Sequence, residues 1–310
     1  MSVTVLFDAA PANWPRYEGP LAKALQAAGV DATLTTDAPP EQVDFIVYSP
    51  DGAITDLTPY TRARAVLSLW AGVERIITNP TLTQPLARMV DPGMTEGMTE
   101  WIVAHTMRHH IGMDAHLEAA PGTWQQITPP LARNRRIGLL GLGTLGSAAA
   151  LALAGLNFNV SGWSRRPKQI NGITCHSGQD GLREIMACSE ILILLLPQTA
   201  GTEGLLNAGT LSLMPRGASI LNPGRGPLID DEALLAALDT GQISRATLDV
   251  FRIEPLPRDH PFWAHPRVTV TPHIASETRP ETAVTIIAEN IRRSEAGEPL
   301  LHLVDRTAGY

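Results

Sequence analysis

Three short segments in the second half of the chain carry side chains that could hold an anion and move a proton. They have the sequences NPGRG, LDVFRIEPLP and TPHIAS, and they supply Arg225, Glu254 and His273. Each segment follows an apolar run that is typical of a strand. Because ligands of α/β proteins bind at the carboxyl ends of parallel strands, we expect the three side chains at one edge of a sheet.

These three residue types have complementary chemistry. The guanidinium of Arg225 can hold a carboxylate or polarise a carbonyl oxygen. His273 can donate a proton to that oxygen while a hydride reaches the carbon. Glu254 can accept a hydrogen bond from the imidazole, orient the ring and favour its protonated form. The combination predicts a catalytic site that reduces a carbonyl group.

A glycine-rich loop could bind the cofactor of such a reaction. The sequence GLGTLG starts at Gly141 and matches G-x-G-x-x-G between an apolar strand and a helix. Gly141 allows a tight turn, Gly143 lets a pyrophosphate approach the backbone, and Gly146 lets the helix pack against the sheet. Thr144 and Leu145 open the helix, whose first N–H groups favour phosphate. We therefore predict a dinucleotide site here.

The end of the next predicted strand indicates which dinucleotide binds. An NAD site usually has Asp or Glu there, to accept a hydrogen bond from the ribose 2′-hydroxyl. This chain instead has Ser164, Arg165, Arg166 and Lys168 within the sequence GWSRRPK. Arginine can bind a phosphate in a bidentate fork, whereas a carboxylate would repel it. The sequence therefore predicts NADP(H) rather than NAD(H), with these four residues around the 2′-phosphate.

In these motifs the chain resembles the D-2-hydroxyacid dehydrogenase family. GLGTLG, NPGRG, LDVF-x-x-EPLP and TPH occur in the family's order and spacing, and the resemblance covers nearly the whole chain. Within the family the chain is most similar to the glyoxylate/hydroxypyruvate reductase A group, through WSRRPK, HPRVTVTPHIAS after EPLP, TRPETA and the closing VDRTAGY. The resemblance implies NADPH-dependent reduction of small 2-oxo acids such as glyoxylate and hydroxypyruvate.

The resemblance also implies roles for single residues. Arg225 would bind the substrate and act in catalysis, Glu254 would be the partner of the histidine, and His273 would be the general acid/base. Asp249 would lie close to the nicotinamide carboxamide, although its residue type and position also suit a strand-end residue that caps a turn. In the family, cofactor contacts also come from the loop LPQT.

That loop begins with Leu196 and Pro197. Both residues are predicted cofactor contacts, and a plain strand-to-helix loop explains them equally well.

The segment SLWAGVE resembles the family's substrate-carboxylate loop, in which backbone N–H groups around Ala71 and Gly72 would meet the acid. The chain departs from the common pattern with Trp70, which either narrows the pocket in favour of two- or three-carbon acids or is a core or interface aromatic. Trp70, Ala71, Gly72 and Arg225 are thus the predicted substrate contacts.

Two other functions share this fold. One is a dehydrogenase for a longer 2-oxo acid. The other is a dinucleotide-sensing interaction protein similar to the transcriptional corepressors of the fold.

A zinc site would need three or four converging ligands. His105 and His109 are one helical turn apart, and His110 and His116 follow, but the pattern around them is that of an ordinary helix. We predict no metal.

The elements that must position these residues alternate between strands and helices. This alternation predicts α/β architecture with parallel sheets. The resemblance implies a flavodoxin-like substrate domain of residues 1–93 and 283–310, and a Rossmann-type NADP-binding domain of residues 94–282. One long helix is expected from Met94 to about Ala120.

Composition limits the remaining partners. The chain has 310 residues and a net charge of −7, so nucleic acid is not an expected partner. No apolar run is long enough to span a membrane, and the first residues lack the features of a secretory signal. Cys175 and Cys188 are too few for a disulfide scaffold. We expect a cytoplasmic protein, and the resemblance implies a homodimer formed through the dinucleotide domain.

Overall fold

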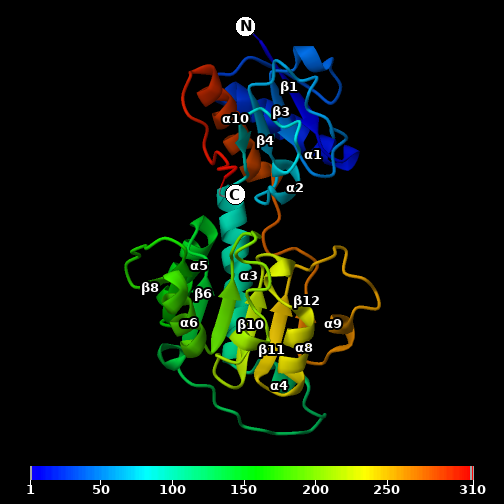
Figure 1. Cartoon of the computed structure of the whole chain (residues 1–310). Helices are drawn as coiled ribbons and strands as arrows, with labels where there is room; N and C mark the ends of the chain where they lie inside the picture. Colours follow the sequence, from blue (N-terminus) through cyan, green and yellow to red (C-terminus); the bar gives the residue numbers. More distant parts are fainter. Residues whose placement is uncertain (1, 308, 310) are drawn as a thin grey trace. The chain divides into compact units, whose positions relative to one another are not determined.

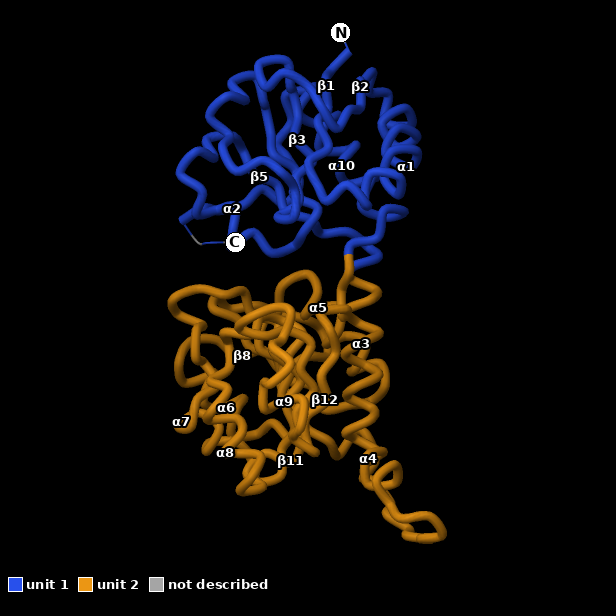
Figure 2. The backbone as a smooth tube through the Cα atoms, turned by 90° about the vertical axis from the view of Figure 1, so that its right-hand side faces the viewer, with its two compact units in different colours: residues 1–94, 278–310 blue, residues 95–277 orange. Residues whose placement is uncertain are grey.

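The computed structural model describes residues 2–307 and 309. It divides into two compact units (Figure 2): unit 1 is Met1–Met94 with Thr278–Tyr310, and unit 2 is Thr95–Glu277. The chain therefore returns to unit 1 at Thr278, before the position 283 that the sequence suggested.

Unit 1 is built on a five-stranded parallel sheet (Figure 1). The spatial order is β2-β1-β3-β4-β5, which is the flavodoxin-like order. All residues of β3 and β4 are buried. The elements are β1 (Val3–Asp8), η1 (Pro11–Asn13), α1 (Trp14–Ala27), β2 (Ala32–Thr35), η2 (Pro40–Gln42), β3 (Phe45–Tyr48), β4 (Ala65–Ser68), α2 (Glu74–Ile77), β5 (Leu86–Ala87) and α10 (Pro280–Glu295).

The spacing of the buried residues along α1 and α10 explains how these helices cover the sheet. In α1 the buried residues Tyr17, Leu21 and Leu25 recur every four positions and form one apolar stripe. In α10 the residues Val284 and Ile291 belong to a similar stripe, and both helices contribute to the same hydrophobic core as β1, β3 and β4. The C-terminal helix thus folds with the N-terminal segment rather than with unit 2.

Unit 2 is built on a seven-stranded parallel sheet of order β12-β11-β10-β9-β6-β7-β8. Counted from β6, this is the dinucleotide-binding order 3-2-1-4-5-6 with one further edge strand, so the predicted fold class is confirmed. The strands are β6 (Arg136–Leu140), β7 (Asn159–Ser164), β8 (Thr174–Ser177), β9 (Ile191–Leu194), β10 (Ala218–Asn222), β11 (Ile243–Leu248) and β12 (Val268–Val270). The helices are α3 (Pro92–His110), which begins in unit 1, α4 (Met113–Leu117), η3 (Ala132–Asn134), α5 (Thr144–Gly155), α6 (Gly178–Cys188), α7 (Ala208–Leu211), η4 (Gly226–Leu228), α8 (Asp231–Asp239) and α9 (Pro261–Ala264).

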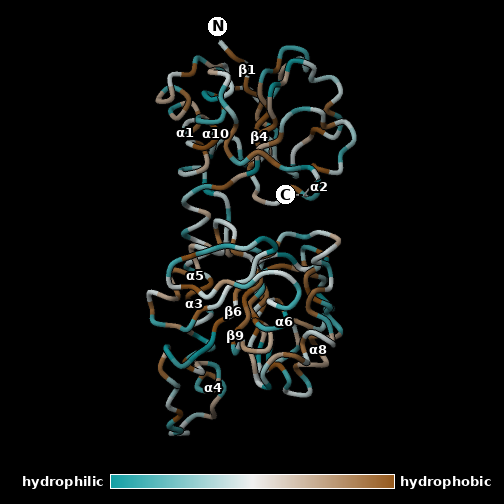
Figure 3. Tube along the Cα trace, turned by 60° about the vertical axis from the view of Figure 1, so that its left-hand side comes forward, coloured by the Kyte–Doolittle hydropathy of each residue, from teal (hydrophilic) through white to brown (hydrophobic). Residues whose placement is uncertain are grey.

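Helices cover both faces of this sheet. Leu192 and Leu194 of β9 belong to one hydrophobic core, whereas Ile191 and Ile193 belong to the other. Successive side chains of a strand point to opposite faces, so an unbroken apolar strand needs cover on both sides. Figure 3 shows β6 and β9 as hydrophobic segments inside unit 2.

The predicted single helix from Met94 to about Ala120 is wrong. Helix α3 ends at His110, and Gly112 has a φ of 66° before the short helix α4 begins. A left-handed glycine ends a helix because it turns the backbone away from the helical path. Strands β2, β5 and β8 were also not predicted. They are short, and neither β2 nor β8 contains a fully buried residue.

No helix among the described residues is long and apolar enough to cross a membrane.

Candidate functional site

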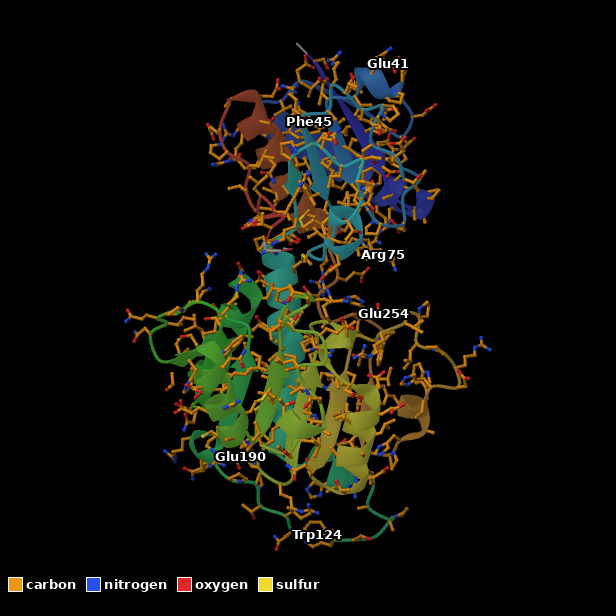
Figure 4. All side chains as sticks on the ribbon, in the orientation of Figure 1. Glu41, Phe45, Arg75, Trp124, Glu190 and Glu254 are labelled. Carbon is orange, nitrogen blue, oxygen red and sulfur yellow. The ribbon has the colours of Figure 1, made fainter. Side chains whose placement is uncertain are left out.

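The imidazole of His273 is paired with the carboxylate of Glu254. The distance from Nδ1 to Oε2 is 2.7 Å, and Oε1 accepts a hydrogen bond from the N–H of Phe251 at 2.8 Å. Both carboxylate oxygens are therefore engaged, and the ring is held by its Nδ1 side. The His273 side chain is 48% exposed, so its Nε2 side is accessible to a ligand. Figure 4 shows Glu254 in the loop that follows β11.

Competing effects set the charge of Glu254. Burial by itself would raise its pKa, but the hydrogen bonds from His273 and from the Phe251 N–H outweigh burial. The positive charges of His273 and Arg225 act in the same direction, so the pKa of Glu254 lies below its ordinary value of 4.5. The carboxylate thus stays ionised and can stabilise an imidazolium.

The backbone of His273 has an uncommon conformation. Its φ is 54°, in the left-handed region, which costs energy for a non-glycine residue unless the surroundings hold it. The hold comes from Asp249, which is 1% exposed. The carbonyl oxygen of Asp249 accepts from the His273 N–H at 2.8 Å.

The carboxylate of Asp249 also organises the loop after β12. Oδ1 accepts from the Thr271 hydroxyl at 2.5 Å and from the Ile274 N–H at 3.0 Å, while Oδ2 accepts from the Ala275 N–H at 2.9 Å. These bonds fit the strand-end capping role that the sequence left open. The contact with a nicotinamide carboxamide stays a prediction.

Arg225 is held between two glycines that allow close packing. A Cβ on Gly224 would lie 2.7 Å from the carbonyl oxygen of Leu194, and a Cβ on Gly226 would lie 2.0 Å from the carbonyl carbon of Phe251. The turn is fixed by Asn222, whose Oδ1 accepts from the Gly224 N–H and whose Nδ2 donates to the Arg225 carbonyl oxygen. The half-buried Arg225 therefore lies on a rigid base beside the loop that carries Glu254.

The three glycines of the GLGTLG loop differ in their surroundings. Gly141 has a φ of 113°, which favours glycine, and a Cβ there would lie 2.4 Å from the Leu195 carbonyl oxygen. A Cβ on Gly146 would lie 1.8 Å from the Gly141 carbonyl oxygen. A Cβ on Gly143 would meet no atom within 4 Å. The protein thus requires glycine at the first and third positions, whereas the second faces open space beside the start of α5.

The cationic turn after β7 is attached to this loop. The Lys168 ammonium donates to the Leu142 carbonyl oxygen, and the Ser164 hydroxyl donates to the Arg166 carbonyl oxygen at 2.7 Å. Arg165 and Arg166 are exposed. No Asp or Glu occurs from residue 162 to 168, so this turn fits a 2′-phosphate better than a free ribose hydroxyl.

The other predicted cofactor contacts are more restricted. The side chain of Leu196 is buried in the hydrophobic core of unit 2, which leaves its backbone as the group that could reach a ligand. The Pro197 carbonyl oxygen accepts from the Thr202 hydroxyl at 2.7 Å. Side-chain contact between Leu196 and a cofactor is therefore not supported.

The predicted substrate loop lies in unit 1, directly after β4. Its base is fixed, because the Ser68 hydroxyl bonds both the N–H and the carbonyl oxygen of Trp70, and the Thr278 hydroxyl donates to the Leu69 carbonyl oxygen at 2.6 Å. The Trp70 residue is 42% exposed, so its core alternative is not supported. Within residues 2–307 and 309, the N–H groups of Ala71 and Gly72 donate no hydrogen bond.

The histidines of α3 contact neighbouring side chains of unit 2. His109 Nε2 lies 2.9 Å from the Thr247 hydroxyl, and the ring of His105 lies 4.4 Å from that of Trp101. Within the described part of the chain, no three His, Cys, Asp or Glu side chains converge in a way that could hold a metal ion.

Residue types alone did not single out Asn222 or Thr271, which hold the loops of Arg225 and His273. Both are polar residues at the ends of apolar strands, within motifs that were otherwise assigned. Asn222 is buried and Thr271 is half-buried. A polar residue in such a position commonly has a hydrogen-bond partner, and this is the pattern that could have identified them.

Comparisons with known proteins agree with this geometry. The family model of the NAD-binding domain of D-isomer-specific 2-hydroxyacid dehydrogenases matches residues 101–275. A glyoxylate/hydroxypyruvate reductase A from Yersinia enterocolitica is 43% identical over 255 residues, which cover 80% of this chain and 82% of the relative. The corresponding protein of Serratia proteamaculans is 40% identical over 257 residues, with the same coverage of both chains.

Solved structures show the same similarity. A D-isomer-specific 2-hydroxyacid dehydrogenase from Xanthobacter autotrophicus Py2, in complex with NADPH and MES, has a TM-score of 0.92 and 39% identity, and each chain is covered completely. An NADPH-dependent glyoxylate/hydroxypyruvate reductase from Sinorhizobium meliloti, in complex with NADP and sulfate, has a TM-score of 0.88 and 32% identity, again with complete coverage.

Proposed function

The chain belongs to the D-isomer-specific 2-hydroxyacid dehydrogenase family, and from this premise we propose that it reduces small 2-oxo acids such as glyoxylate and hydroxypyruvate with NADPH. The observation that carries the proposal is the Glu254–His273 pair. It lies at the carboxyl edge of a dinucleotide-binding sheet, with Arg225 close enough for its charge to lower the pKa of Glu254. The names of these relatives agree with this activity.

The residues around the GLGTLG loop fit NADPH. The open space at Gly143 suits the close approach of a pyrophosphate, and the turn with Arg165, Arg166 and Lys168 suits a 2′-phosphate. When bound, NADPH supplies the hydride. Unit 2 would thus be the NADP-binding domain and unit 1 the substrate domain.

The chain's own residues supply the proton and the electrostatics. Arg225 would hold the substrate carboxylate and polarise the 2-oxo group. His273 would donate the Nε2 proton to the forming alkoxide, while Glu254 stabilises the imidazolium before transfer. The N–H groups of Ala71 and Gly72 would receive the substrate carboxylate on unit 1, and Trp70 would limit the size of the substrate.

The test measures loss of reduced-nicotinamide absorbance with purified protein. Glyoxylate, hydroxypyruvate and a longer acid, 2-oxobutyrate, are each assayed with NADPH and with NADH. We expect rapid loss with NADPH and the two smaller acids, and an Arg165→Ser/Arg166→Ser variant that loses its preference for NADPH over NADH. Preference for 2-oxobutyrate would show that the substrate is a longer 2-oxo acid. Equal rates with NADPH and NADH would show that the cationic turn does not select the 2′-phosphate. NADPH binding without any turnover would contradict the enzyme and favour a sensing protein.

We also propose a homodimer formed through unit 2 and a cytoplasmic location. Trp124, which Figure 4 labels, is 91% exposed and lies in the segment that follows α4. Ile127 and Leu131 of the same segment are exposed as well. Exposed apolar residues in one segment are typical of an interface. The free thiols of Cys175 and Cys188 are compatible with a reducing compartment.

A further inference from the structure

The loops that carry Arg225 and Glu254 pack against each other without a gap. A Cβ on Gly226 would lie 2.0 Å from the carbonyl carbon of Phe251 and 2.5 Å from the nitrogen of Arg252. Van der Waals contact of this kind limits how close the loops can come, but it does not prevent them from sliding past or away from each other. The backbone hydrogen bonds between β10 and β11 end where the Asp249 N–H donates to the Asn222 carbonyl oxygen, so beyond this point a further directional interaction is needed to fix the register of the two loops.

The Arg252 side chain supplies that interaction. Its Nη2 donates to the Ile229 carbonyl oxygen at 2.7 Å and lies 3.4 Å from the Pro227 carbonyl oxygen. Both carbonyl groups belong to the chain that leaves Arg225 through the turn η4. The guanidinium, which comes from the Glu254 loop, thus holds the segment that follows Arg225.

Acidic groups orient the other side of the guanidinium. Nη1 lies 3.7 Å from Glu203 and Nε lies 3.9 Å from Asp231 at the start of α8. Asp231 is also 3.6 Å from Nε2 of His260, which precedes α9. A planar guanidinium presents donors in several fixed directions, so one side chain can join carbonyl groups and carboxylates at once, which a lysine ammonium does less well.

We propose that Arg252 is a positioning residue for the reduction: it fixes the position of Arg225 relative to the Glu254–His273 pair. This inference rests on the proposed function for its kinetic part only. If Arg225 holds the substrate and His273 protonates it, the distance between these groups depends on the register of the two loops. Arg252 itself would contact neither the substrate nor the cofactor.

The experiment compares Arg252→Ala and Arg252→Lys with a control, Arg258→Ala. Arg258 lies six residues further along the same loop, is exposed, and makes no hydrogen bond or ion pair with any described residue. We expect Arg252→Ala to lower kcat for glyoxylate about 10- to 100-fold, because small misplacement of catalytic groups has effects of this size. KM for NADPH should stay unchanged, since the GLGTLG loop is carried by β6. Arg252→Lys should recover part of kcat, and the control should match the wild type.

A second measurement does not depend on turnover. In Arg252→Ala, the carboxyl ¹³C resonance of Glu254 should titrate at higher pH than in the wild type, because a loosened loop weakens the hydrogen bonds that lower the pKa of Glu254. The proposal is overturned if Arg252→Ala matches Arg258→Ala in both kcat and the Glu254 titration. It is equally overturned if kcat falls only together with Tm, with no recovery in Arg252→Lys. A wild type that reduces no 2-oxo acid would refute the proposed function, and the Glu254 titration would still decide the role of Arg252.

Discussion

At the residue scale, the His273 imidazole has its Nδ1 side committed to Glu254, so one ring nitrogen is left for a substrate. The backbone of His273 is strained, and its N–H donates to the Asp249 carbonyl oxygen. The position of this ring is therefore fixed by the surrounding structure at an energetic cost. A histidine with a purely structural role would not need an exposed ring on a fixed base.

His273→Asn tests this role. The substitution removes the proton donor, so kcat for glyoxylate should fall by about 10²- to 10⁴-fold. NADPH binding, followed by the change in nicotinamide fluorescence on titration, should remain at the wild-type level. Full activity in this variant would refute the assignment of His273.

The pH dependence tests Glu254. Its lowered pKa means that the pairing with His273 contributes to stability at pH above the unfolded value near 4.5 and is lost as the pH falls through the lower folded value. The acidic limb of the kcat/KM profile should accordingly lie below pH 4.5. In Glu254→Gln this limb should disappear and kcat should fall. An acidic limb that is the same in both proteins would show that another group controls it.

Half-buried His109 predicts acid sensitivity of the fold. Burial lowers the pKa of His109 from 6.5 to about 4, so the unfolded chain binds a proton between these values that the folded chain does not. The free energy of unfolding should therefore decrease by about 3 kcal/mol as the pH falls from 6.5 to 4. Urea denaturation at several pH values measures this slope, and His109→Gln, which can still bond Thr247, should flatten it. An unchanged slope would mean that His109 does not cause the loss.

At the element scale, the junction between β6 and α5 separates what folding requires from what a ligand requires. Gly146 lets the first turn of α5 pack against the Gly141 carbonyl oxygen, whereas a Cβ on Gly143 would meet no atom within 4 Å. The two glycines of one motif should therefore respond differently to the same substitution.

Gly146→Ala should destabilise unit 2, because the added Cβ overlaps backbone that can move only if α5 shifts; overpacking of this kind costs about 1–3 kcal/mol. Gly143→Ala should keep the wild-type Tm and weaken NADPH binding, because its Cβ occupies the space proposed for the pyrophosphate. Differential scanning calorimetry and an NADPH titration on both variants check this. Equal NADPH affinity in Gly143→Ala and wild type would place the cofactor elsewhere.

At the scale of the whole molecule, the segment between α4 and β6 extends away from the rest of unit 2 (Figure 2). Arg245 of β11 fixes the base of this segment to the sheet: its guanidinium bonds Glu118 at 2.6 Å and lies 3.6 Å from the buried Asp114. Beyond this base the large apolar side chains of Trp124, Ile127 and Leu131 are exposed. A second copy of the chain is the partner that we propose for them.

Light scattering on the purified protein should give the mass of a dimer, and Trp124→Asp should shift it toward the monomer. The control is Leu213→Asp, since Leu213 is 42% exposed but lies after α7, outside this segment. A monomeric wild type, or a Trp124→Asp protein that remains a dimer, would contradict the proposed interface.

The family and the fold class could be determined from the sequence alone, and both are confirmed. The reason is physical: a phosphate loop, a strand end and a helix start are local features, so GLGTLG and the basic turn after β7 lie within one strand–helix–strand unit. The predicted reaction and cofactor agree with the names of the relatives. The break at Gly112 was missed, because apolar spacing alone does not show which glycine adopts a positive φ.

Only the tertiary structure decided how the motifs act on each other. Glu254 reaches His273 across 19 residues, Asp249 holds the loop at Ile274 across 25, and Arg252 bonds Ile229 across 23. These pairs form because parallel strands bring their carboxyl ends together whatever the length of chain between them. Residue types could therefore identify the groups that do chemistry, whereas their orientation, and the side chains that hold them, depend on strand order and packing.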